Sequence, residues 1–298
     1  MFIKQFYPYV LDAGEKEKIT HEALSECAFV PPSGLEWFTE GFVCPVNVAG
    51  NENLVFKVQN TLQVALQKEE KVLPAGVINN AVNEKIQVIE AEENRAVNRK
   101  EKQSLKEQVT DDLLPRAFTK KSIRRGFVTN RFLLIDKASS TQSEAFLTKL
   151  RQVLGGLNAT LPRTEQSPSS LMTSWLHQKE AAGNFVLDTE CELKAAGESA
   201  AIIKASKQDL TSDELDVLLE TKTVTRLGLI WADKIRFVLH EDLSFTKVQF
   251  LDVLQEEASD EGEDRESLLA ATQLICTREL ENMLLELIDL LGGLSKQD

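Results

Sequence analysis

The sequence predicts an α+β fold with mixed or antiparallel sheets and long helices, in a subunit of more than one domain. Two observations favour this class. Short apolar runs flanked by turn-forming residues recur in the first 70 residues and again after residue 185, as expected for strands. Other long stretches carry apolar residues at helical spacing, and the chain shows no internal repeat.

The chain opens with strand-like segments. An apolar start through Phe2 and Phe6 is followed by runs at 54–58 and 62–66, which are separated by a short polar turn as in a hairpin. Pro74 ends this region.

Apolar residues at helical spacing predict a helix from about residue 75 to at least residue 93. High helix propensity continues to residue 109, but Leu105 and Val109 fall roughly opposite the earlier apolar stripe. A kinked helix and a second helix are both compatible with this pattern.

Strands are expected again at 126–128 and 132–135, before an amphipathic helix at 143–154 that Gly155 and Gly156 close. The segment 163–170 is rich in Pro, Ser and Thr and is the best candidate domain boundary. The elements expected beyond this boundary are a helix around Trp175, strands at 185–193 and 200–205, a helix at 213–220 capped by Ser212, strands at 223–232, 235–240 and 245–250, an acidic linker or helix start at 255–266 and a helix at 267–291.

This pattern suggests a three-part organisation. We expect a central sheet domain from residues 1–74 and 120–165, a helical basic tip from 75–119, and a second α+β domain with an acidic C-terminal segment from 166–298.

Composition narrows the function classes. No window approaches 18 uninterrupted apolar residues and no export signal is evident, so we expect a cytoplasmic protein without membrane spans. The four cysteines form no CxxC, and with three scattered histidines they match no zinc pattern. Nucleotide-binding and hydrolase motifs are absent from the sequence, and we expect no cofactor.

Charge is segregated along the chain. The net charge of −13 argues at first against nucleic acid. Residues 94–125, however, hold ten basic and four acidic side chains, whereas residues 250–290 hold twelve carboxylates and two arginines. One part of the molecule is therefore basic and another strongly acidic.

The basic stretch is a candidate DNA contact. On a helix, Arg95, Arg99, Lys102 and Lys106 would share a sector about 60° wide, a line of cations that suits a line of phosphates. An ordinary solvated helix face, with Glu residues interspersed, explains the same spacing. Further candidates are Arg116, Lys120, Lys121 and Arg124, with Arg125 beside them, and a smaller spot at Lys204, Lys207 and Gln208, just before a helix start that could add an anion site.

Aromatic residues are scarce in the basic stretch, where Phe118 is the only one between residues 94 and 125. Single-strand readers stack bases on aromatic rings, so the composition favours contacts with a duplex backbone. Phe118 itself is compatible with a position in the core or with an apolar contact between subunits.

Two alternatives stay open. Carboxylates at 256–266 could hold Mg²⁺ for a metal-dependent nuclease, although such charge runs are usually solvated loops. A basic face could also dock an acidic protein, which would make the chain a protein-binding scaffold.

Four segments carry a resemblance to a known family. These are 68–74 (KEEKVLP), 113–118 (LLPRAF), 207–212 (KQDLTS) and the acidic run at 260–266, which in this order and spacing resemble the RdgC family of recombination-associated proteins. The resemblance covers essentially the whole chain.

The resemblance implies a ring-shaped homodimer with a basic-lined hole, sequence-independent binding of duplex DNA, association with the nucleoid and restraint of RecA filament formation. It also implies no enzymatic activity. By motif, it places Arg116 and Phe118 at a subunit contact, and Lys207 and Gln208 on a protruding finger that meets DNA.

Overall fold

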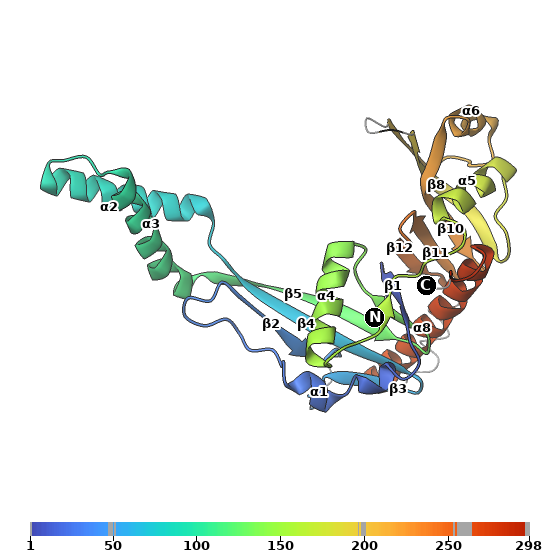
Figure 1. The fold of residues 1–298 in the computed structure, drawn as a ribbon, viewed down its shortest axis with the longest axis horizontal. Coiled ribbons are helices and arrows are strands. Elements are labelled where there is room, and N and C mark those ends of the chain that lie inside the picture. The colour runs from blue at the N-terminus through green and yellow to red at the C-terminus, as the bar shows by residue number, and fades with distance from the viewer. Residues whose placement is uncertain are drawn as a thin grey trace. The chain divides into compact units, whose positions relative to one another are not determined.

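The computed structural model describes residues 2–46, 50, 52–195, 197, 201–252, 254 and 264–295, and it confirms the α+β class with antiparallel sheets (Figure 1). The chain forms two compact units. Unit 1 comprises Met1–Glu26, Cys44–Ala65 and Arg124–Asp298, and unit 2 comprises Cys27–Val43 and Leu66–Ile123. The predicted helical tip lies within unit 2, and the predicted boundary at 163–170 lies inside unit 1.

One sheet of unit 1 is built around β1 (Tyr7–Leu11). It runs in the order β5–β6–β1–β7, with the end of β5 (Phe118–Val128), β6 (Phe132–Ile135) and β7 (Ala159–Thr160). Helix α4 (Ser140–Val153) packs closely on it, because a side chain at Gly126 would lie 2.8 Å from the Phe146 ring.

The predicted hairpin is confirmed as β3 (Val55–Val58) paired with the start of β4 (Thr61–Val72). Both β4 and β5 are much longer than predicted. Their additional residues are largely polar, so apolar patterning did not identify them. Strand β2 (Phe38–Val43), the short helix α1 (His21–Ser25) and the 3-10 turn at Lys16–Lys18 were also missed.

A second sheet of unit 1 has the order β12–β11–β10–β8–β9. Its strands are β8 (Phe185–Ala195), β9 (Ile202–Ser206), β10 (Lys222–Trp231), β11 (Ile235–His240) and β12 (Phe245–Phe250), close to the predicted ranges.

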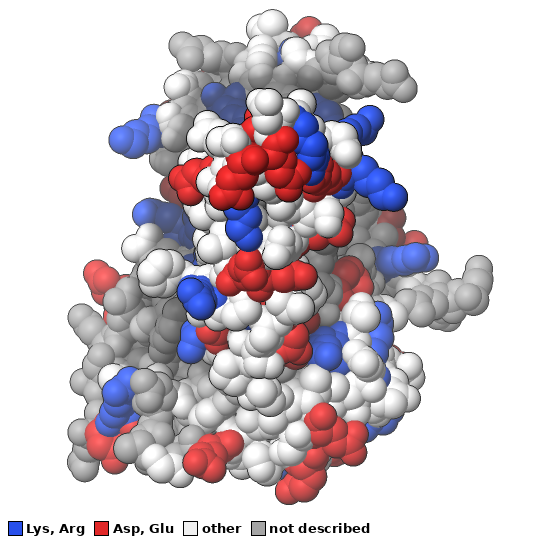
Figure 2. Space-filling view, turned by 90° about the vertical axis from the view of Figure 1, so that its left-hand side faces the viewer, with Lys and Arg blue, Asp and Glu red and all other residues white. Residues whose placement is uncertain are grey.

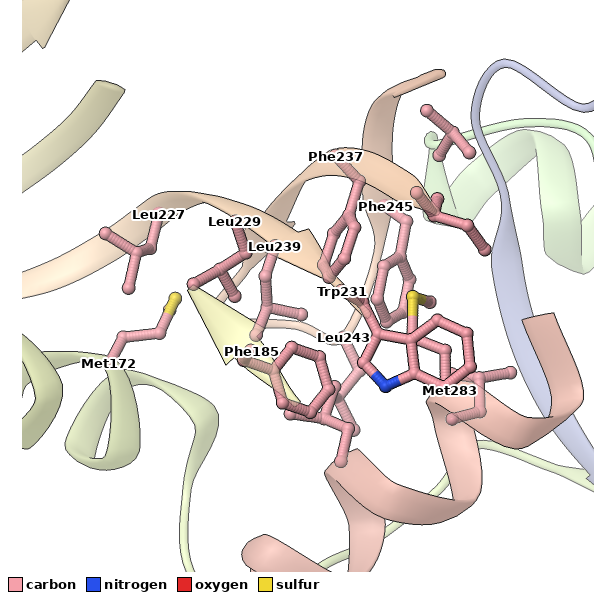
Figure 3. Close-up of a cluster of buried hydrophobic side chains, with 14 of the residues drawn as sticks. Met172, Phe185, Leu227, Leu229, Trp231, Phe237, Leu239, Leu243, Phe245 and Met283 are labelled. Carbon is pink, nitrogen blue, oxygen red and sulfur yellow. The ribbon is translucent and has the colours of Figure 1, made fainter. Parts of the chain in front are cut away.

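The main core lies on one face of this sheet, against α5 (Pro168–Gln178) and α8 (Arg265–Leu290). Aromatic rings fill much of it (Figure 3). Trp175 and Phe185 pack at 5.6 Å between ring centroids, and Phe6 stacks on Phe245 at 4.4 Å. The opposite face of the sheet carries charged side chains.

Two helices follow β4 in unit 2, α2 (Ala75–Glu93) and α3 (Arg99–Leu113), and they lie side by side (Figure 1). The second-helix alternative is therefore the correct one. Their common core is small, with Ile78, Val82 and Val109 as its buried residues. The strands of unit 2 run in the order β2–β4–β5, and β5 follows a 3-10 turn at Leu114–Arg116.

The predicted helix at 213–220 is wrong in form. It is a 3-10 turn, Asp213–Leu215, followed by the four-residue α6 (Asp216–Leu219), and the Ser212 side chain makes no capping hydrogen bond. Most of the acidic segment, residues 255–263, lies outside the described residues. None of the helices described is long and apolar enough to cross a membrane.

Candidate nucleic-acid interface

Arg95 does not lie on the helix that the basic spacing predicted. Helix α2 ends at Glu93, Asn94 takes a left-handed conformation (φ 48°), and α3 begins only at Arg99. The side chain of Asn98 caps α3 by accepting a hydrogen bond from the Glu101 amide at 3.0 Å. The predicted four-residue stripe on one helix is therefore wrong at its first member.

Arg95 instead holds this turn together. Its guanidinium donates two hydrogen bonds to Glu101, at 2.7 and 2.8 Å, and one to Glu93 at 2.6 Å. The hydrogen bonds to Glu101, and to a smaller extent that to Glu93, raise the pKa of Arg95 above its usual value. The same pairing with Arg95 lowers the pKa of the Glu101 carboxyl below its usual value. A doubly paired guanidinium is a weak candidate for a phosphate partner.

Arg99, Lys102 and Lys106 are exposed on α3 and keep the predicted sector. Within the described part of the chain, no carboxylate forms an ion pair with any of the three. Nearby carboxylates are engaged elsewhere: Glu101 binds Arg95, Glu107 accepts a hydrogen bond from Gln103 at 2.9 Å, and Asp112 pairs with Lys85 at 3.2 Å. We name these three cations the α3 row.

The cluster that follows α3 is divided by the fold. Arg116 is exposed in the 3-10 turn, and Lys120 and Lys121 are exposed on β5. Lys121 lies 3.6 Å from Glu69, whereas Lys120 interacts electrostatically with Glu70. Neighbouring strand residues point to opposite faces, so these two lysines do not belong to one surface.

Arg124 is buried, with 9% of its surface exposed, and its guanidinium donates to the Gln142 carbonyl at 3.4 Å. This placement removes it from the candidate surface. Phe118, by contrast, is 88% exposed, which excludes the core interpretation within one chain.

The smaller basic spot lies at the end of β9. The Lys204 ammonium pairs with the Glu192 carboxylate at 3.1 Å, and Lys207 is exposed just after the strand. The backbone N–H of Gln208 donates a hydrogen bond to the backbone carbonyl of Thr189 at 3.1 Å. The expected anion site at a following helix is not supported. The first residues there include Asp213 and Asp216, both paired with Lys179.

The candidate nuclease carboxylates are mostly outside the described residues. Asp264, which is described, caps α8 by accepting a hydrogen bond from the Ser267 amide at 2.8 Å. Among the residues that the structure describes, no group of three or more His, Cys, Asp or Glu side chains could hold a metal ion.

Known proteins resemble the chain over more than nine tenths of its length. The family model described as "Putative exonuclease, RdgC" matches residues 1–294. A recombination-associated protein RdgC of Neisseria gonorrhoeae is 49% identical over 98% of this chain and 99% of its own length. The proteins of the same name from Laribacter hongkongensis and Pseudomonas aeruginosa are 46% and 36% identical, over 91% and 95% of this chain and 90% and 92% of their own lengths.

The chain belongs to the RdgC family. The resemblance inferred from the four sequence segments is thereby confirmed. The names of these RdgC relatives associate them with recombination and mention no catalytic activity, whereas the family description mentions an exonuclease.

On the face drawn in Figure 2, the basic side chains of this RdgC chain do not form one continuous surface. Lys and Arg side chains are interspersed there with Asp and Glu side chains. Available cations therefore have to be identified one by one from their ion pairs, which sequence spacing alone does not give.

Sequence reasoning also missed exposed apolar residues of unit 2. Phe38, on β2, is 56% exposed with the Lys68 ammonium 4.6 Å from its ring centre, and Val72 on β4 is 45% exposed. The aromatic and β-branched residues in the run 37–43 (WFTEGFV) could have indicated this strand.

Proposed function

We propose that this RdgC-family chain binds duplex DNA through its phosphate backbone, without sequence preference and without enzymatic activity. The α3 row carries the proposal, because it presents three exposed cations at helical spacing with no carboxylate partner among the described residues. Each cation that neutralises a phosphate releases counterions, which is the main source of sequence-independent affinity. Arg116, Lys120 and Lys207 are proposed as additional contacts.

The charge-reversal variant R99E/K102E tests this function. It removes two phosphate partners and sets two carboxylates against a polyanion, so we expect most duplex binding to be lost. The matched control K57E/R163E makes the same change in charge at two exposed residues of unit 1. Equal loss of binding in both variants would show that only net charge matters and would contradict a specific role for α3.

We further propose that the chain works as a homodimer that encircles DNA and limits assembly of RecA filaments, which would place it on the nucleoid. The exposed Phe118 supports a subunit contact, and the names of the relatives support a role in recombination. The wild-type chain should slow RecA filament growth on DNA, and R99E/K102E should not. Equal slowing by both would separate the RecA effect from DNA binding.

The family description makes exonuclease activity the second candidate. Linear duplex incubated with the chain and Mg²⁺ should stay intact if the proposal is correct. Release of nucleotides that stops with a chelator would instead establish the nuclease, and would direct attention to residues 256–266.

A further inference from the structure

The charged face of the five-stranded sheet has an ordered arrangement that the sequence did not indicate. Three carboxylates, Asp188, Glu190 and Glu192, occupy every second position of β8, and each pairs with a cation from another strand. The pairs are Asp188 with Arg236 at 3.3 Å, Glu192 with Lys204 at 3.1 Å and with Arg226 at 3.6 Å, and Glu190 with Lys247. We call these seven side chains the open face.

The two kinds of charge differ in depth. The carboxylate side chains are only 12–23% exposed, whereas their cationic partners are 45–67% exposed. A polyanion approaching the sheet therefore meets the cations first. The lower layer of carboxylates neutralises them from beneath.

Gly228 makes room for this lower layer. Leu227 and Leu229 pair with Cys191 and Leu187, so that three residues of β8 face the single residue Gly228. A side chain there would lie 2.9 Å from Glu190 Cγ and 3.4 Å from Asp188 Cβ. Without one, these carboxylates reach across β10 toward cations on β11 and β12.

The open face is also hollowed. A cavity of about 280 Å³ is lined by Glu190, Glu192, Lys204, Arg226 and Lys247, among others. Burial alone would raise the pKa of Glu192, but the hydrogen bond with Lys204 leaves this pKa below its usual value. Glu192 is thus held ionised as a partner of the surface cations.

We propose that the open face is a second phosphate-binding surface whose affinity is held down by Asp188, Glu190 and Glu192, which act as internal competitors for its four cations. The inference rests on the proposed binding of DNA. Exposed ion pairs are individually weak, so phosphates can displace the carboxylates, but each displacement reduces the gain from binding. The α3 row has no such competitors among the described residues.

The variant D188N/E190Q/E192Q tests this competition. Loss of the three carboxylate charges leaves the four cations free to bind phosphates, so duplex affinity at 0.1 M salt should rise at least about tenfold. The slope of log affinity on log salt should become steeper by about 0.9 for each new phosphate contact. The matched control is E165Q/E180Q/E220Q, which removes three exposed carboxylates of unit 1 that have no ion pair in the described part of the chain. We expect its slope to equal that of the wild type.

A second variant isolates the cations. Adding K204Q, R226Q, R236Q and K247Q to the first triple variant should return affinity and slope to near wild-type values. If the triple variant fails to fold, E192Q alone serves, because Glu192 has two cationic partners. The same rise in the control variant, or an unchanged slope in folded D188N/E190Q/E192Q, would overturn the inference. A wild-type chain that binds no duplex would instead overturn the proposed function.

Discussion

At the scale of single residues, what decides whether a cation can meet phosphate is its partner rather than its position in the sequence. Arg95 and Arg99 are four residues apart, yet Arg95 is bound by two carboxylates and Arg99 by none among the described residues. Arg124 was a candidate by sequence but is buried against a backbone carbonyl. Sequence spacing does not report such pairing, because the partner depends on where the helix begins.

Arg95 and Arg99 provide a matched pair for testing this distinction. R99Q should weaken duplex binding and make the salt slope shallower by about 0.9, the value of one phosphate contact. R95Q should leave the slope unchanged, and the loss of its bonds to Glu93 and Glu101 should instead loosen the turn between α2 and α3. Salt titration of both variants checks this. A slope change confined to R95Q would contradict the assignment.

Phe118 carries the prediction about assembly. An apolar ring that is 88% exposed in one chain contributes little to folding, so F118A should change the free energy of unfolding by no more than about 0.5 kcal/mol. If the ring is a subunit contact, the same variant should weaken the dimer. Sedimentation and thermal melting measured together decide this: a large loss of stability with an unchanged dimer would refute the interface.

At the scale of elements, apolar periodicity predicted the buried strands and helices well. Strands β6, β11 and β12 have the predicted bounds because their buried residues are apolar. The polar parts of β4 and β5 were missed because they have no apolar face that a sequence pattern could show. Hydrogen bonds to neighbouring strands hold them in the sheet. For example, Thr119 on β5 donates to Glu69 on β4 at 2.6 Å.

The paired helices of unit 2 depend on a very small core. I78A removes most of one of its three buried side chains and should cost about 2 kcal/mol, the lower end for such a truncation, because the site is close to solvent. Hydrogen exchange should then accelerate in residues 75–113 and stay slow in β10 and β11. Uniform acceleration over the whole chain would show that these helices do not unfold on their own.

At the scale of the whole molecule, sequence composition identified segregated charge, and the four motif segments identified the family. Neither gave the division into two units, nor the pairing that separates the α3 row from the open face. These depend on contacts between residues distant in sequence, such as Lys204 with Glu192 and Lys247 with Glu190. We therefore propose for the whole molecule that a chain of net charge −13 binds DNA through a few cations that have no carboxylate partner among the described residues.

The most direct test of that claim is a salt titration of wild-type binding to two duplexes of unrelated sequence. Three phosphate contacts from the α3 row predict a slope of log affinity on log salt of about −2.7 per subunit, and steeper with further contacts. The two duplexes should bind almost equally. A slope near zero, or a preference above about 10³ for one sequence, would contradict binding through the phosphate backbone.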